Sequence, residues 1–445
     1  MQADVTTSNS PVTIDRRAIW AIAIPAMATN VATALIGVGD MWIVGQLGSA
    51  STQGAVDIGA RLFAMLFVVM NFLKTGTTGL VAQAMTRSDG DSASNVLLRG
   101  VAVASAIAIA LLLSKPMLLP VLLDVLGARG ETLTAARIYA EIRYWSAPAV
   151  LVNYAMIGFL VGQRRMGTVL IIEVGYNLVN VALGAWLCLA LDWGIAGIGW
   201  SSALAEGGKL AVLGFVVGLQ LRRSGGFAFP GLTDLAPARL RPFLAVKRDL
   251  FLRTMILMLA LAALTRLSAE RGPVVLAANG IYYQLFLVIA LLLDGFENAG
   301  QVLGGERTGA SDRAGLRAYA RAITARALGT GLVLSGMFLM FGSEVAGWFA
   351  ATEAVADYAR EYAVWLAVLP LAGAAGFALD GILVGASWTR VLLGVMIGTA
   401  AAYAGLLWLT WPLGNAGLWL SFTVFLSLRG IAQGWIVHRR TVPAG

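Results

Sequence analysis

The sequence contains one cysteine, Cys188, and one histidine, His438, among its 445 residues. A single cysteine rules out a disulfide within the chain and a cysteine-rich metal cluster. A single histidine, close to the C-terminus, rules out a site with several histidine ligands and leaves the interior of the chain without a histidine base. These absences argue against a metalloenzyme, and we expect no cofactor and no metal site.

Charge is also scarce, because only 13% of the residues are charged whereas 58% are apolar. The charged share is about half of that in an ordinary soluble domain, and a soluble chain could not hide so much apolar surface. The net charge of +8 does not indicate nucleic acid here, since Lys and Arg collect in the cytoplasmic loops of membrane proteins. We expect an all-α polytopic membrane protein, with the lipid bilayer around it and no nucleic-acid partner.

About twelve apolar segments are long enough to cross roughly 30 Å of hydrocarbon. The first follows Arg16-Arg17 and is expected to remain as an uncleaved helix. Most Lys and Arg residues fall in loops on the side of the N-terminus. This asymmetry predicts a multi-pass protein of the inner (plasma) membrane with both termini in the cytoplasm.

The two halves of the chain resemble each other at a nearly constant distance along the sequence. A shift of 223 residues places Leu62-Phe63 on Leu285-Phe286 and Gly158 on Gly381. Six spans return the chain to the same side, so this duplication predicts two lobes related by a pseudo-two-fold axis along the membrane normal. The expected domains are a disordered N-terminal tail (1–16), an N-terminal six-helix lobe (17–220), a cytoplasmic linker (221–246), a C-terminal six-helix lobe (247–438) and a C-terminal tail (439–445).

Asp40 is the most conspicuous charged residue in an apolar segment, because apolar sequence continues beyond it. Pro25 and several glycines in the same span allow the helix to bend. An ionised side chain at the centre of the bilayer costs at least about 2.5–3.5 kcal/mol, so burial disfavours the charged form of a carboxyl group. Asp40 is therefore predicted to bind a proton or a cation. The alternative is a helix-end carboxylate in the outer headgroup region.

The fifth span carries Asn177 and Asn180 on one helix face, and the sixth carries Ser202. Amides at membrane depth are predicted to bind a cation or a neighbouring acid, or else to bond one helix to another. Three further residues in these spans have a structural interpretation. Glu173 lies near the inner surface, and Glu206 can pair with Lys209 within one helix turn.

A polar stripe is predicted on the eighth span, where Asp294, Glu297, Asn298 and Gln301 share one helix face. The duplication places Lys74 at the position of Glu297. If the lobes face each other, Lys74 pairs with Asp294 or Glu297 across an inner gate and releases on opening. The alternative is a static polar belt at the cytoplasmic ends of the helices.

Several short motifs point to a known family. They are Gly39-Asp40, GQLGS at 45–49, FLKTGTTGLVAQA at 72–84, LDGF at 293–296 and LDGILVGA at 379–386. With the twelve-span duplicated organisation, they make the chain resemble the multidrug and toxin extrusion (MATE) transporters, in the branch named for the DNA-damage-inducible protein F. The resemblance covers nearly the whole chain from about residue 17. Asp380, in the last motif, is expected to make a helix-end or gate contact.

The resemblance implies a secondary active antiporter that exports organic, often cationic or amphipathic, compounds by alternating access. It makes Asp40 the coupling acid and adds Asn180 and Ser202 to the cation-coupling site. The family commonly has an acid one turn beyond the asparagine, where this sequence has Gly184. A sodium site needs several oxygen ligands, so we expect coupling to protons rather than to sodium. Asn177 or a water is expected in the space beside Gly184.

Three alternatives remain open. They are a sodium-coupled exporter of the same family, a flippase for lipid-linked precursors, and a sensor or scaffold that does not transport. A flippase generally needs extra spans and a basic cavity, whereas the polar residues in these spans are mostly acids and amides. No nucleophile constellation supports an enzyme. We expect a monomer whose partners are a small organic substrate, protons and lipid.

Overall fold

The computed structural model describes residues 14–46, 50–87, 92–223, 237–350 and 352–442, and within these ranges the chain is helical with no β-strand. The N-terminal half contains α1 (Arg16–Gly45), α2 (Ala50–Met70), α3 (Phe72–Ala84), α4 (Ala93–Val125), α5 (Gly130–Arg143), α6 (Ala147–Gly162), α7 (Met166–Ala185) and α8 (Gly194–Arg223). The C-terminal half contains α9 (Pro237–Ala269), α10 (Pro273–Gly309), α11 (Arg313–Trp348), α12 (Glu353–Glu361), α13 (Val364–Gly385), α14 (Thr389–Leu409) and α15 (Gly414–Thr441).

The predicted class, an all-α polytopic membrane protein, is confirmed. Eleven helical segments of the described residues are long and apolar enough to cross a membrane. One of them joins α2 to α3 across Asn71, and another joins α5 to α6. The remaining long helix, α1, has 30 residues and therefore spans about 45 Å. By length, α1 can be a twelfth span, which would match the expected number of about twelve.

The expected linker differs from the structure at its edges. α8 continues to Arg223, and α9 begins at Pro237, because proline is favoured in the first turn of a helix. Much of the predicted range 221–246 is therefore helical. The part at 224–236, like most of the predicted N-terminal tail and the last residues of the C-terminal tail, lies outside the described residues.

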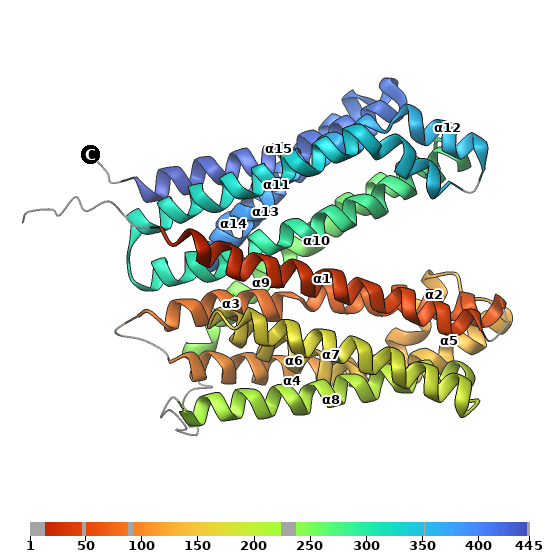
Figure 1. Cartoon of the computed structure of the whole chain (residues 1–445), viewed down its shortest axis with the longest axis horizontal. Helices are drawn as coiled ribbons and strands as arrows, with labels where there is room; N and C mark the ends of the chain where they lie inside the picture. The colour runs from red at the N-terminus through yellow and green to blue at the C-terminus, as the bar shows by residue number, and fades with distance from the viewer. Residues whose placement is uncertain (1–13, 47–49, 88–91, 224–236, 351, 443–445) are drawn as a thin grey trace, which may run out of the picture.

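The helices form two lobes, as Figure 1 shows. The N-terminal lobe consists of α1–α8, and the C-terminal lobe of α9–α15. The lobes lie against each other at the end where α1 begins and α15 ends, and they diverge toward the end that carries α5 and α12 (Figure 1). We call these the closed end and the open end.

The backbone repeats itself in the two lobes, as the duplication predicts. A β-carbon on Gly158 would lie 2.5 Å from the carbonyl oxygen of Lys74, and one on Gly381 would overlap the carbonyl oxygen of Glu297. Both members of the second pair lie 223 residues after those of the first. Arg164 and Ser387, also 223 residues apart, both have positive φ angles, of 61° and 57°. Equivalent helices therefore pack, and equivalent turns close, in the same way.

Small residues bring the lobes together at the closed end. A β-carbon on Gly79 of α3 would lie 2.9 Å from the Val384 carbonyl oxygen of α13, and one on Gly305 of α10 would lie 2.9 Å from the Gly79 carbonyl oxygen. No side chain fits at these positions without a shift of the backbone. The helices of the two lobes thus meet backbone to backbone. Nearby, the ring of Trp20 on α1 packs edge-on against Phe296 on α10 at 5.4 Å.

Candidate functional site

A cavity of about 440 Å³ lies between the lobes toward the open end. Its N-terminal wall comes from α2, with Arg61, Met65 and Val69. Its other wall comes from α9 and α10, including Met258 and Tyr283. Methionine side chains adapt to irregular shapes, and aromatic rings offer a face to organic cations. The walls therefore suit a small, largely apolar molecule without fixing its identity.

The predicted coupling residue, Asp40, belongs to α1, but its side chain lies outside the described residues. The neighbouring backbone is placed by α7. A β-carbon on Gly39 would lie 2.8 Å from Val181, and one on Gly184 would lie 3.1 Å from the Ile43 side chain. This part of α1 therefore runs against the same stretch of α7 that carries the predicted asparagines.

The structure brings three predicted site residues, Asn177, Asn180 and Ser202, to the packed interface of α7 and α8. All three are buried, and the Asn180 amide nitrogen donates to the Ser202 hydroxyl at 3.5 Å. The side-chain amide oxygen (Oδ1) of Asn180 and both polar atoms of the Asn177 side chain have no hydrogen-bond partner among the described residues. A buried amide left without a partner costs free energy, so these atoms are suited to bind a proton carrier, a cation or water.

The space beside Gly184 is filled differently from the expectation. Its nearest neighbours are the Ile43 and Ser201 side chains, at 3.1 and 3.4 Å from the position of a β-carbon. Asn177 does not occupy this space because it lies seven residues, about 10 Å, along the same helix. A third group, the Ile198 side chain, lies at 3.8 Å, so two of the three filling groups are apolar and the position offers few oxygen ligands.

The C-terminal polar stripe is formed on α10, and its residues interact with one another. Gln301 donates to the Glu297 carboxylate at 2.9 Å, and the Asn298 side chain donates to the Asp294 carbonyl oxygen at 2.8 Å. Lys74 of the opposite lobe lies in electrostatic range of Asp294. It is not within ion-pair distance of Asp294 or Glu297. The predicted gate pair is therefore not formed in this conformation, although the closed end is shut.

Asp380 occupies a different environment from the one predicted. α13 continues to Gly385, so Asp380 lies inside the C-terminal lobe and is fully buried. Its carboxylate pairs with Arg253 of α9 and Arg429 of α15, and Gln433 donates to its other oxygen at 2.5 Å. These partners bind three helices of one lobe together. Asp380 thus anchors the lobe and does not form a helix-end or gate contact.

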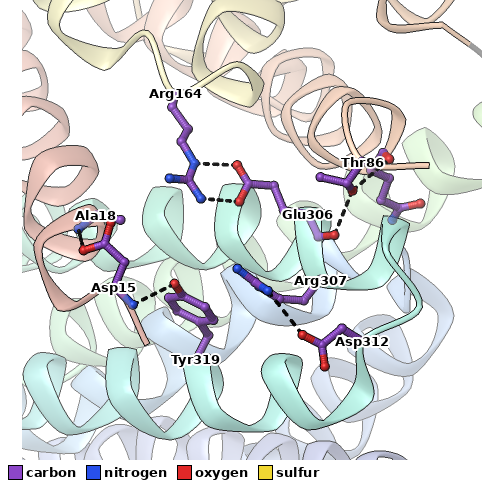
Figure 2. Close-up of polar contacts among 9 residues, drawn as sticks. Asp15, Ala18, Thr86, Arg164, Glu306, Arg307, Asp312 and Tyr319 are labelled. Carbon is purple, nitrogen blue, oxygen red and sulfur yellow. Dashed lines mark hydrogen bonds and ion pairs between the residues drawn. The ribbon is translucent and has the colours of Figure 1, made fainter. Parts of the chain in front are cut away.

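The closed end is held by side chains that the sequence analysis did not single out as a group. Arg164, in the α6–α7 turn, forms a two-pronged ion pair with Glu306 of α10, with one contact of 2.5 Å (Figure 2). The Thr86 hydroxyl donates to the Glu306 carbonyl oxygen at 2.8 Å (Figure 2). Gln83 donates to the Gly385 carbonyl oxygen at 2.6 Å. We call these cross-lobe contacts the closed-end latch. Hydrogen bonding to Glu306 raises the pKa of the Arg164 guanidinium, which keeps the pair charged.

Residues next to the latch fix the start of α1 and the turn before α11. The backbone N–H of Asp15 donates to the Tyr319 hydroxyl at 3.1 Å, and its carboxylate caps α1 by accepting from the Ala18 N–H (Figure 2). Arg307 pairs with Asp312 at 3.2 Å (Figure 2). Asp15 and Asp312 both offered a sequence signal, because an aspartate before a helix is a common cap.

Lys247 makes a second cross-lobe connection that the sequence did not reveal. It belongs to α9, and its buried ammonium donates to the carbonyl oxygens of Phe72 and Leu73 at 3.1 and 2.8 Å and to the Thr77 hydroxyl at 2.9 Å. These acceptors lie in the first two turns of α3, just after the break at Asn71. Lys247 therefore ties the start of the C-terminal lobe to the centre of the N-terminal lobe.

Two lobes of membrane-spanning helices, with a cavity between them at one end and a latch at the other, define a polytopic membrane protein of the transporter class. The MatE family profile matches residues 25–186 and 250–406, one segment in each lobe. The chain is 31% identical over 430 residues to DNA damage-inducible protein F of Escherichia coli K12, covering 96% of this chain and 93% of that protein. The chain therefore belongs to the MatE family.

Other relatives agree. A probable multidrug resistance protein NorM of Rhizobium meliloti is 26% identical over 456 residues, with 95% of this chain and 93% of that protein covered. The outward-facing structure of a multidrug resistance MATE family transporter superposes with a TM-score of 0.86 at 18% identity, covering 96% of each chain. These findings make the chain a multi-pass membrane transporter of the multidrug and toxin efflux type, not an enzyme. They confirm the resemblance stated from the sequence.

Proposed function

We propose that the protein is a proton-coupled antiporter that exports organic cations by alternating access. The observation that carries the proposal is the asymmetry of the cleft between the lobes. The open end contains the cavity, whereas the closed end is sealed by backbone contacts and by the latch between Arg164 and Glu306. Such a molecule presents its site to one side of the membrane, and rocking of the lobes would present it to the other.

Charge supports a cationic substrate. Asp294 and Glu297, both half-buried, belong to the helix of the C-terminal lobe that lies against α1 and α3. Tyr283 and the methionines of the cavity supply the apolar and aromatic contact that a lipophilic cation needs. A cation would reach these acids only when the lobes are apart, and this gives the two conformations different affinities for it.

Asp40 supports proton coupling. The ionised carboxylate stabilises the conformation whose cleft holds a cationic substrate. Protonation of Asp40 removes this stabilisation. Protonation from the open side would let α1 move against α7 and expel the substrate. Sodium is the weaker candidate, because Ile43 fills the place beside Gly184 where a further oxygen ligand would be needed. The distribution of Lys and Arg supports a cytoplasmic closed end with both termini inside.

The test is gradient-driven efflux of ethidium in everted vesicles. The wild-type protein is expected to drive transport with an imposed pH gradient and not with a sodium gradient. The Asp40→Asn variant should lose this transport while still exchanging ethidium across the membrane at equal pH. Undiminished uphill transport by Asp40→Asn, or transport driven by sodium alone, would remove the proton-coupling role.

A further inference from the structure

A line of buried polar residues continues from the Asn180–Ser202 contact toward the closed end. On α7 it consists of Asn180, Asn177 and Glu173, and on α8 of Ser202, Glu206 and Lys209. Each set repeats at helical spacing, so each forms one stripe, and the stripes face each other because the two helices pack as antiparallel neighbours. We call these six residues the α7–α8 seam.

The lower half of the seam is built around the Lys209 ammonium. It lies 3.3 Å from the Glu206 carboxylate, 3.5 Å from both oxygens of Glu173, and 3.9 Å from the centre of the Tyr176 ring. The pair of Glu206 with Lys209 predicted from their spacing is thus present, but it is shared with Glu173. The Lys209 and Glu173 side chains are 7% and 8% exposed, so this cluster is enclosed by protein.

The charges of the cluster do not balance. Two carboxylates share one ammonium, which leaves one negative charge if both acids are ionised. The groups that face the cluster are Asn153 and Tyr154 from α6, Tyr176 from α7 and, in electrostatic range of both tyrosines, Arg143 from α5. The Arg143 guanidinium lies over the rings of Phe63 and Tyr139, 5.0 and 5.6 Å from their centres. An uncompensated buried charge is costly, so the cluster has room for one more positive charge.

The two glutamates are not equivalent. The Glu206 carboxylate accepts from the Asn153 amide at 2.8 Å as well as from Lys209. Among the described residues, the Glu173 carboxylate makes only the long contacts to Lys209. In the other lobe, by contrast, both oxygens of Asp380 are bonded to arginine or glutamine. Glu173 is therefore the acid of the cluster that is held least firmly as an anion.

We propose that Glu173 is a second proton-binding residue of the N-terminal lobe, which accepts the proton released by Asp40 and passes it toward the closed end. This inference rests on the proposed proton coupling. A water held by Asn177 would carry the proton between the two sites, because the buried amide has an unused donor and an unused acceptor. From Asn180 to Glu173 the distance along α7 is about 10 Å, and the helix begins about 10 Å further on at Met166. Lys209 stays paired with Glu206 and compensates its charge, so that Glu173 is the carboxylate that takes up one proton.

Infrared difference spectra between pH 8 and pH 5, recorded on the purified full-length protein in lipid, test the site without any substrate. The wild-type protein is expected to show a protonated-carboxyl band that is absent in Glu173→Gln. Glu306→Gln, which removes an acid held by the latch, is the matched control and should keep the band. Lys209→Met should enlarge the band, because loss of the ammonium obliges a further carboxyl group to take up a proton. A purely structural Glu173 would leave the wild-type and Glu173→Gln spectra identical, and that result overturns the proposal.

Transport separates this inference from the proposed function. In Glu173→Gln, pH-driven ethidium efflux is expected to fall about tenfold or more, as for loss of a group that transfers protons. A tenfold fall in rate corresponds to about 1.4 kcal/mol in the activation free energy. Ethidium binding should stay within about twofold, because the substitution removes no substrate contact. Glu173→Asp should restore part of the rate. If ethidium efflux by the wild-type protein does not depend on the pH gradient, the proposed function is refuted. Normal efflux by a folded Glu173→Gln variant refutes only the second site.

Discussion

The latch between Arg164 and Glu306 sets how strongly the closed end is held shut. Two charge-assisted hydrogen bonds from a guanidinium to a carboxylate contribute about 1.5–3 kcal/mol when buried. The Arg164 side chain is 41% exposed and that of Glu306 is 13% exposed, so solvent screening reduces the contribution to about 1–2 kcal/mol. Arg164→Ala should therefore raise the ratio of molecules whose closed end has parted to molecules whose closed end is shut by about 5- to 30-fold.

Spin labels on Met85 of the N-terminal lobe and Arg313 of the C-terminal lobe report this ratio as a distance distribution. Cys188 is replaced first so that only the two introduced cysteines react. Arg164→Lys should shift the distribution less than Arg164→Ala, because lysine keeps the positive charge. It should still shift it, because lysine cannot make the two parallel hydrogen bonds of the guanidinium. The combined swap Arg164→Glu with Glu306→Arg should return it toward the wild type. Unchanged distances in Arg164→Ala would mean that the backbone contacts and the bonds from Thr86 and Gln83 hold the closed end without the ion pair.

Two further predictions concern the lobe anchor and the orientation. Asp380→Ala leaves Arg253 and Arg429 buried without their anion, so the free energy of unfolding should fall by about 3–5 kcal/mol. Asp357→Ala, which breaks an exposed pair with Arg360, should leave it nearly unchanged, and an equal loss in both variants would contradict the argument. Met85→Cys, in a variant without Cys188, should react with a membrane-impermeant maleimide in everted vesicles and not in right-side-out vesicles. The reverse pattern would place the closed end outside.

The fold could be predicted because it follows from quantities that the sequence carries locally. Apolar length indicates the spans, and the 223-residue shift indicates two like lobes. The shift was accurate enough to pair Gly158 with Gly381, two glycines that make the same helix contact in the structure. The predicted pair of Glu206 with Lys209 lies within one helix turn and is likewise local.

Contacts between distant segments could not be predicted in the same way. Arg164 and Glu306 are 142 residues apart, and Arg253 and Asp380 are 127 residues apart. Periodicity tells which face a residue occupies but not which helix will lie opposite that face. Asp380 was therefore assigned to a helix end, whereas its partners come from α9 and α15. The same reason explains why Glu173 seemed peripheral until α8 placed Lys209 beside it.

The glycines of the closed end determine what this seal exposes when it parts. Separating Gly79 from Val384 and Gly305 from Gly79 uncovers amide and carbonyl groups rather than large apolar side chains. Apolar area costs about 25 cal/mol per Å² when it enters water, whereas an uncovered helix carbonyl oxygen has a second lone pair that can accept from water. The seal is therefore one that water can wet. Opening the closed end should therefore expose little apolar area and cost little free energy through the hydrophobic effect. The passage formed there would be lined by hydrated peptide groups instead of an apolar surface.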